Sequence, residues 1–129
     1  MDDALVVDAT VFIDHLRNRA VATGYLAPLL SNRNVVLHPA VLAEVLTGAR
    51  DKRHLAALDA ALGEVRRCTV KGSDMTVAVN LVRQHTLAAG IGWPDCLIAA
   101  TCMRLGLPVV TLNDKHFRAV RGLSVVRPY

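Results

Sequence analysis

The chain has 129 residues, a net charge of +4 and a hydrophobic fraction of 53%, which argues against a disordered polypeptide and predicts one packed domain over residues 1–129. No apolar run reaches the roughly 18 residues that cross a bilayer, and Asp2 and Asp3 stand where a signal peptide would be basic. We therefore expect a cytoplasmic protein with no membrane partner. Three cysteines without C-x-x-C spacing point to neither a disulfide framework nor a zinc site.

The basic residues are mostly arginine, with 12 Arg among 15 basic side chains. Arginine forks match phosphate geometry, so this bias favours a polyanionic ligand. It also suits an acidic protein partner, and it can follow from genome base content alone. Aromatic residues make up only 4% of the chain, which argues against a platform that stacks nucleic-acid bases.

Apolar runs and helical periods alternate along the chain. Short β-branched runs predict strands, and Pro39, Gly63, Gly90 and Gly106 mark helix boundaries. Strands separated by helices predict an α/β fold, a three-layer α/β/α sandwich with a mostly parallel central sheet. The strands are expected at 4–8, 34–38, 65–70, 108–112 and 123–126, and the helices at 10–16, 21–30, 39–50, 53–62, 73–90 and 95–106.

Asp8 directly follows the first predicted strand. Ligands of such sheets bind beyond the carboxyl ends of the strands, so this carboxylate stands where a site is expected. An Asp in this position also commonly caps the next helix. Thr10 offers an alternative cap that would leave Asp8 free, and both interpretations remain open from the sequence.

Glu44 is the single charged residue between Pro39 and Ala49. It falls outside the apolar stripe of its predicted helix, which is ordinarily the position of a solvated side chain. Its neighbours on that face, among them Ala40, Ala43 and Gly48, are all small. A face of small residues favours close approach by another group, and we expect Glu44 to face a cleft.

Asp95 opens a helix that is apolar nearly all round until Arg104. Such a helix is expected to be central and buried, and its positive N-terminal end would favour an ionised carboxylate. A simple capping role is the alternative. Carboxylates gathered from distant segments need a cation to offset their repulsion, and hard oxygen ligands suit Mg²⁺ or Mn²⁺.

Taken together, four segments resemble the PIN-domain ribonucleases, specifically the VapC-type toxins of toxin–antitoxin pairs. Each segment is weakly specific alone, but the four occur in the family's order within a chain of matching length. They are Val6 to Asp14, Glu44 to Arg50, Asp95 to Ala100, and Gly106 to Phe117.

The resemblance implies cleavage of RNA phosphodiester bonds with Mg²⁺ or Mn²⁺, leaving a 5′-phosphate and a 3′-hydroxyl. Asp8, Glu44 and Asp95 match the family's acidic, metal-binding positions. The resemblance also implies an antitoxin whose tail occupies the acidic site, and a homodimer. We further expect Thr10, Arg17, Arg50, Thr111 and Arg118 to contact substrate, with Arg19 as another candidate for binding phosphate.

The fourth family position is Asp or Asn, and here it falls on Asn113. Asp114 is the nearest acid, but successive residues leaving a strand tend to point to opposite sides. We therefore expect Asn113 to face the site and Asp114 to lie outside it. Thr111 shares the side of Asn113, and its hydroxyl is expected to orient that amide or a water. Three acids rather than four leave open whether one or two metal ions bind.

Two rival interpretations come from other classes. A haloacid-dehalogenase-like phosphatase would use Asp8 as its nucleophile, but it would want a second Asp where this chain has Thr10. A catalytically inactive PIN-like module would keep the fold for RNA or protein binding, and the presence of all three acids argues against it.

Overall fold

A five-stranded sheet lies at the centre of the molecule, in a computed structural model that describes residues 3–129. Met1 and Asp2, the latter cited above against a signal peptide, lie outside the described residues. The strands are β1 (Leu5–Val7), β2 (Val35–Leu37), β3 (Arg66–Arg67), β4 (Val109–Val110) and β5 (Val125–Val126). They lie in the order β3-β2-β1-β4-β5.

Every pairing in this sheet is parallel. In the register of β1, Val6 lies opposite Val36 of β2 on one side and Val109 of β4 on the other. Parallel strands need crossover connections, and here the helices supply them. They are α1 (Ala9–Leu16), α2 (Ala20–Ser31), α3 (Pro39–Thr47), α4 (Lys52–Leu62), α5 (Gly72–Ala89), α6 (Trp93–Leu105) and α7 (Asp114–Arg118).

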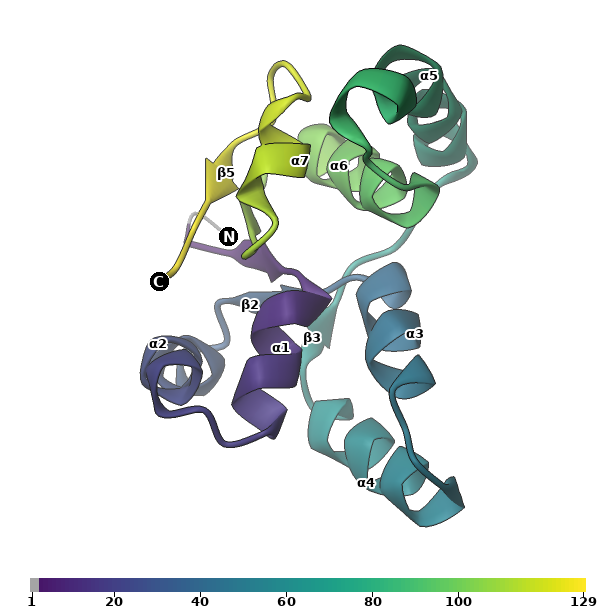
Figure 1. Cartoon of the computed structure of the whole chain (residues 1–129). Coiled ribbons are helices and arrows are strands. Elements are labelled where there is room, and N and C mark those ends of the chain that lie inside the picture. The colour runs from purple at the N-terminus through teal and green to yellow at the C-terminus, as the bar shows by residue number, and fades with distance from the viewer. Residues whose placement is uncertain (1–2) are drawn as a thin grey trace.

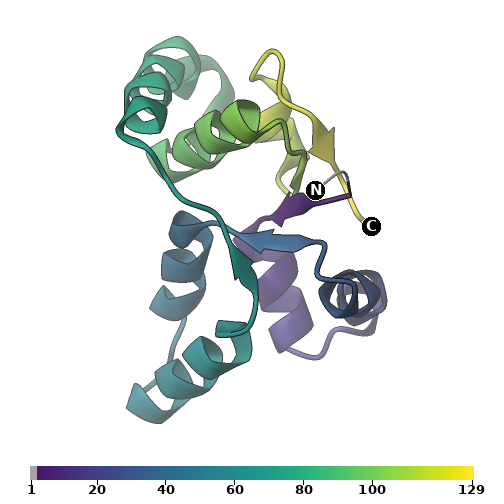
Figure 2. The ribbon, with the colours of Figure 1, turned by 180° about the vertical axis from the view of Figure 1, so that it is seen from behind.

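The helices form two layers, one on each side of the sheet. Figure 1 shows α1 to α4 below the strands and α5 to α7 above them, and Figure 2 shows the same division from behind. The chain order explains this arrangement. From β1 the chain adds β2 and then β3 on one side of the sheet, and it then returns to add β4 and β5 on the other side of β1. Because the crossovers are right-handed, this change of direction places the two sets of helices on opposite faces.

The sequence-based fold class is therefore confirmed. All five strands exist, each shorter than the predicted run, and α1 to α6 occupy the predicted segments within a few residues. Gly90 and Gly106 end α5 and α6 with positive φ angles of 68° and 67°, a conformation that favours glycine. The sequence did not predict the short helix α7.

Neither residue considered as the cap of α1 makes a capping bond. The helix begins at Ala9, so Asp8 occupies the cap position, but its side chain makes no capping hydrogen bond, and Thr10 lies inside the helix. The Thr10 side chain instead donates a hydrogen bond to Asp8 and accepts one from the backbone N–H of Leu112. This residue therefore joins the end of β1 to the segment after β4.

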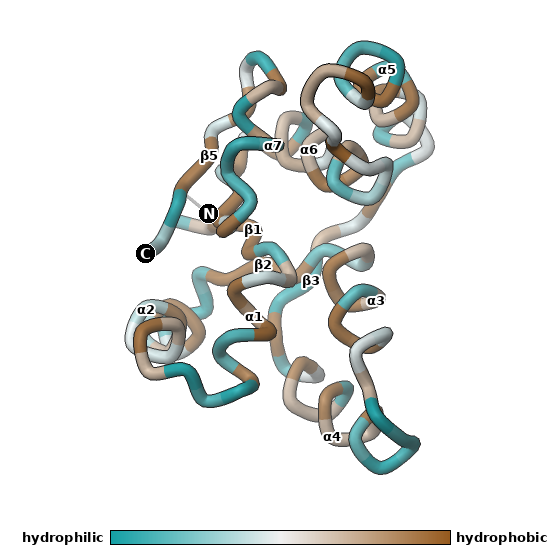
Figure 3. Tube along the Cα trace, viewed as in Figure 1, coloured by the Kyte–Doolittle hydropathy of each residue, from teal (hydrophilic) through white to brown (hydrophobic). Residues whose placement is uncertain are grey.

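The core lies between the sheet and both helix layers. The valines of β1, β2 and β4 are almost completely buried, and Phe12 and Phe117 pack among them. Figure 3 shows hydrophilic residues gathered at the α1–α2 and α3–α4 connections, at the lower end of the molecule. Between residues 3 and 129, no helix combines the length and apolar character needed to cross a membrane.

A buried ion pair ties α5 to α6 on the upper side of the sheet. Both oxygens of the buried Asp74 carboxylate accept from Arg104, at 2.8 and 2.9 Å, and Asp74 also accepts the backbone N–H of Lys71. Arg104 and these hydrogen bonds lower the pKa of Asp74 from 3.8 to about 2, despite its burial. A carboxylate stabilised in this way supports the fold as long as it is ionised.

Asp74→Asn should lower the free energy of unfolding at pH 7 by on the order of 2 kcal/mol, from a pKa shift of roughly two units. Because the folded pKa lies below the unfolded one, this contribution is present above about pH 4 and disappears as pH falls toward 2. Urea unfolding of wild type and variant between pH 2.5 and 7 measures the difference. If the difference in free energy of unfolding between wild type and variant stays constant over this range, ionised Asp74 does not stabilise the fold. The control is Glu64→Gln, which replaces an exposed acid.

Candidate metal centre

The candidate acids converge at one edge of the sheet. The chain reverses its direction across the sheet between β1 and β4, and the carboxyl ends of strands at such a switch point form the usual ligand crevice of α/β sheets. Asp8 follows β1, and Thr111 and Asn113 follow β4. Glu44 lies on α3, which follows β2, and Asp95 lies in the first turn of α6.

Two threonine hydroxyls hold one oxygen of Asp8. Thr111 donates to Oδ2 at 2.8 Å and Thr10 donates to the same atom at 3.3 Å. Each hydroxyl also accepts a backbone N–H, Thr10 from Leu112 and Thr111 from Asn113. The orientation of the carboxylate is thus fixed from both sides of the switch point.

The other oxygen of Asp8 has no hydrogen-bond partner among the described residues, although it is buried. Asp8 makes no side-chain capping bond to α1, which decides between the two sequence-based interpretations against the cap. Leaving a charged oxygen buried without a partner costs free energy unless a ligand supplies the missing interaction. Burial accordingly raises the pKa of Asp8, against the lowering effect of its hydrogen bonds.

The negative charge of Asp8 acts on the carboxyl groups of both Asp95 and Glu44. Burial, then the charges of Asp8 and Glu44, raise the pKa of Asp95 to about 7. Burial and the charge of Asp8 also raise the pKa of Glu44, although that side chain remains exposed on α3. Asp95 is the third residue of α6, after the cap position at Gly92, and its carboxylate has no hydrogen bond or ion pair with another residue between 3 and 129.

This donor set fits a hard divalent cation. One oxygen of Asp8 is buried and unpartnered, and the charge of Asp8 adds to burial in raising the pKa values of Glu44 and Asp95, so a cation beside them would offset this repulsion. In the described part of the chain, no three His, Cys, Asp or Glu side chains lie close enough together to hold a metal ion as they stand. The interaction between the three acids is therefore one of charge rather than of contact.

The segment after β4 separates Asn113 from Asp114. Asn113 is exposed, and its side chain makes no capping bond to α7. Asp114 accepts from Arg118 at 3.3 Å and from Arg127 at 2.9 Å, and its hydrogen bonds with these arginines lower its pKa. The carboxylate of Asp114 is thus engaged by two cationic side chains, and one of them is Arg118, an expected substrate contact.

Thr111 requires a correction. The sequence suggested that it touches substrate or orients the Asn113 amide, but its side chain is completely buried. Its hydroxyl donates to Asp8 and accepts the backbone N–H of Asn113, not the side-chain amide. The buried hydroxyl of Thr111 therefore orients Asp8.

The expected phosphate-binding arginines are not equivalent. Arg17 and Arg50 line one groove of about 410 Å³ between α1, α3 and α4, beside His54. Within residues 3–129 neither guanidinium makes a hydrogen bond or a close ion pair, although the charge of Arg17 contributes to the lowered pKa of Asp14. Arg19, in contrast, pairs with Asp14 at 2.8 Å and lies over the ring of Tyr129.

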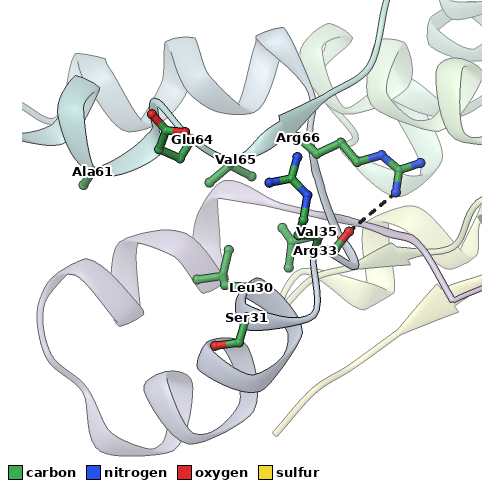
Figure 4. Close-up of a pocket in the computed structure, with 8 residues that line it drawn as sticks. All are labelled: Leu30, Ser31, Arg33, Val35, Ala61, Glu64, Val65 and Arg66. Atoms are coloured by element: carbon green, nitrogen blue, oxygen red, sulfur yellow. Dashed lines mark hydrogen bonds between the residues drawn. The ribbon is translucent and has the colours of Figure 1, made fainter.

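A second hollow, of about 400 Å³, lies at the opposite edge of the sheet. Its lining comes from the segments that precede β2 and β3, at the amino ends of the strands (Figure 4). Arg66 donates there to the backbone oxygen of Arg33 at 3.5 Å. None of Asp8, Glu44, Asp95 and Asn113 lines this hollow, so we do not consider it the candidate metal site despite its size.

Comparison with known proteins gives a consistent result. The model of the PIN domain matches residues 5–123. Ribonuclease VapC19 of Mycobacterium tuberculosis is 32% identical over 114 residues, which cover 87% of this chain and 90% of that protein. The chain belongs to the PIN-domain family. Within it, the chain is of the VapC type, as its four sequence segments indicated.

Solved structures show the same PIN fold. A toxin–antitoxin complex from Klebsiella pneumoniae contains a chain with a TM-score of 0.79 and 23% identity, with 98% of both chains covered. VapBC2 from Rickettsia felis, bound to a DNA fragment from its promoter, gives a TM-score of 0.76 and 20% identity, over 95% of this chain and 96% of that one. Membership of the PIN family removes the haloacid-dehalogenase-like interpretation.

Sequence reasoning missed a second polar group beside the site. Buried His38, Asp74 and Thr101 form a connected network with the partly buried Arg104, described below. Two signals were available in the sequence. His38 follows a strand directly, and Thr101 is the one hydroxyl in the apolar stretch from Cys96 to Met103. Neither signal indicates a partner, because the four residues come from three distant segments.

Asp95→Asn should leave the metal-free protein as stable as wild type or more stable, because it removes one of three mutually repelling charges. Thermal unfolding with a chelator present measures this. Asp59→Asn, which removes an exposed acid from α4, is the matched control and should change little. A clear loss of stability in Asp95→Asn alone would mean that the carboxylate supports the fold rather than a ligand.

Proposed function

We propose that this chain is a metal-dependent endoribonuclease, the toxin of a toxin–antitoxin pair, that hydrolyses phosphodiester bonds of RNA. The observation that carries the proposal is the buried, unpartnered oxygen of Asp8 within the charge field of Glu44 and Asp95. The name of the relative VapC19 supports RNA as the substrate.

Asp8, Glu44 and Asp95 would hold the cation, Mg²⁺ or Mn²⁺, through carboxylate oxygens. When bound, such a cation polarises the phosphate, lowers the pKa of a water and stabilises the leaving 3′-oxygen. Thr10 and Thr111 keep Asp8 in one orientation, so that its free oxygen faces the ligand without rearrangement. Asn113 would complete the site with a neutral amide oxygen, which adds a ligand or holds a water but adds no charge.

The groove beside α3 would take the RNA backbone. Arg17 and Arg50 line this groove and make no close ion pair within residues 3–129, and phosphates on either side of the cleaved bond would neutralise them. Arg118 would join them only by leaving Asp114.

Arg50→Ala should raise the RNA concentration that gives half-maximal cleavage, and the increase should be larger at low salt. An unchanged concentration would mean that Arg50 does not bind the RNA.

Family membership supports the proposed partners. The names of the similar solved structures describe toxin–antitoxin complexes, and a cognate antitoxin whose tail covers the acidic site would keep this chain inactive. A homodimer and a cytoplasmic location are further parts of the proposal that rest on the family resemblance. The rival within the family is an inactive module that binds RNA without cleaving it, and turnover separates the two.

Cleavage of RNA by purified variants in Mg²⁺ tests the function and its residues together. Asp8→Asn should abolish cleavage, since it removes the oriented ligand. Asn113→Ala should reduce the rate by about tenfold or more, the size of effect expected for groups that support a metal site. Asn113→Asp should tighten metal binding.

Asp114→Asn is the matched control, because it alters the neighbouring residue but removes only ion pairs with Arg118 and Arg127. It should keep most of the wild-type rate. Near-normal cleavage by folded Asp8→Asn would refute the assignment of the site. RNA binding by wild type with no cleavage in Mg²⁺ or Mn²⁺ would favour the inactive module.

A further inference from the structure

A completely buried histidine, His38, joins the helix of Glu44 to the helix of Asp95. His38 occupies the cap position of α3, and its Nδ1 accepts the backbone N–H of Ala40 at 3.0 Å. On the other side of the ring, Nε2 lies 3.0 Å from the hydroxyl of Thr101 on α6. One side chain therefore makes both the cap of α3 and a bridge to α6.

These contacts fix the form of the ring. Because Nδ1 accepts a hydrogen bond, it carries no proton, and the proton of the neutral ring is on Nε2, which donates to the Thr101 hydroxyl. Burial favours the same neutral form and lowers the pKa of His38 to about 4. The bridge is thus a neutral hydrogen bond with a defined direction, and the ring stays neutral above about pH 4.

Thr101 continues the connection away from His38. Its hydroxyl lies 2.9 Å from the backbone oxygen of Leu97 and 3.3 Å from Asp74 on α5. Arg104 holds Asp74 and also donates to the backbone oxygen of Thr69, in the segment that follows β3. The bridge between α3 and α6 is therefore anchored to a third helix and to the chain beyond the sheet.

Each acid lies on the same helix as one end of this bridge. Glu44 follows His38 by six residues on α3, and Asp95 precedes Thr101 by six on α6, roughly 9 Å along each helix axis at 1.5 Å per residue. α3 and α6 are in direct contact. The charge of Glu44 contributes to the raised pKa of Asp95, so like charges repel across the same pair of helices that the hydrogen bond between His38 and Thr101 joins.

We propose that the hydrogen bond between His38 and Thr101 is a positioning contact, which holds α3 and α6 at the separation at which Glu44 and Asp95 can bind one cation. The inference rests on the proposed metal site and extends it to two residues that touch neither metal nor RNA. Without the bridge, repulsion would widen the site, and the cation would have to pull the helices together at the expense of its own affinity.

The test is the affinity for Mn²⁺, measured from the electron paramagnetic resonance signal of free Mn²⁺ in titrations of folded protein. Thr101→Val preserves the size of the side chain and removes the hydroxyl, and it should weaken Mn²⁺ binding about tenfold. Thr101→Ser keeps the hydroxyl and should restore affinity to within about twofold of wild type. His38→Asn retains a side chain that caps helices well but is too short to reach Thr101, and it should behave like Thr101→Val.

Leu26→Ala is the control for general loss of stability, because Leu26 is completely buried on α2 and lies outside the network. It should unfold more easily than wild type and still bind Mn²⁺ normally. Wild-type affinity in folded Thr101→Val or His38→Asn would overturn the positioning role. Failure of wild type itself to bind Mn²⁺ would instead refute the metal site, so the two failures are distinguishable.

Discussion

Repulsion among three carboxylates is the constraint on which the rest of this structure depends. Asp8, Glu44 and Asp95 come from three segments near the point where the chain changes direction across the sheet. Burial raises the pKa values of Glu44 and Asp95, and the charge of Asp8 raises both further. Such a cluster persists only if other interactions hold its members in place. The sheet register and the hydroxyls on Asp8 are two of those interactions, and the proposed bridge between His38 and Thr101 would be the third.

Asp8 is held in place in a different way from Glu44 and Asp95. Asp8 is held directly, since Thr10 and Thr111 both donate to one of its oxygens and leave the other for a ligand. Glu44 and Asp95 have no comparable partner, and the position of each follows from that of its helix. In the proposed metal site, one rigid ligand and two more adaptable ones would suit the binding of both a cation and the phosphate of a substrate.

The fold could be predicted from sequence because its signals are local. Alternating strands and helices require parallel crossovers, and glycines such as Gly106 mark helix ends by their backbone freedom. The candidate acids were also predictable, since a charge inside an apolar segment is unusual wherever it occurs. The strand order was not, because it depends on which crossover lies on which face, and only that order brings Asp8 beside Thr111.

The polar contacts behind the site were beyond sequence reasoning for the same reason. His38 and Thr101 are 63 residues apart, and Thr10 and Leu112 are 102 apart. Neither the residue types nor their local sequence context indicates these partners, which are brought together only by tertiary packing. The role expected for Thr111 was wrong because alternation along a strand predicts the side on which a residue lies but not its depth.

The most direct test of the central claim, that these acids form a built cation site, is the free energy of unfolding as Mg²⁺ is raised. A ligand that binds only the folded state stabilises it by RT ln(1 + [L]/Kd), about 2.7 kcal/mol at one hundred times Kd. Wild type should follow this curve, and Asp8→Asn, which lacks the oriented ligand, should show little gain over the same range. Equal stabilisation of both proteins, or of neither, would contradict the account.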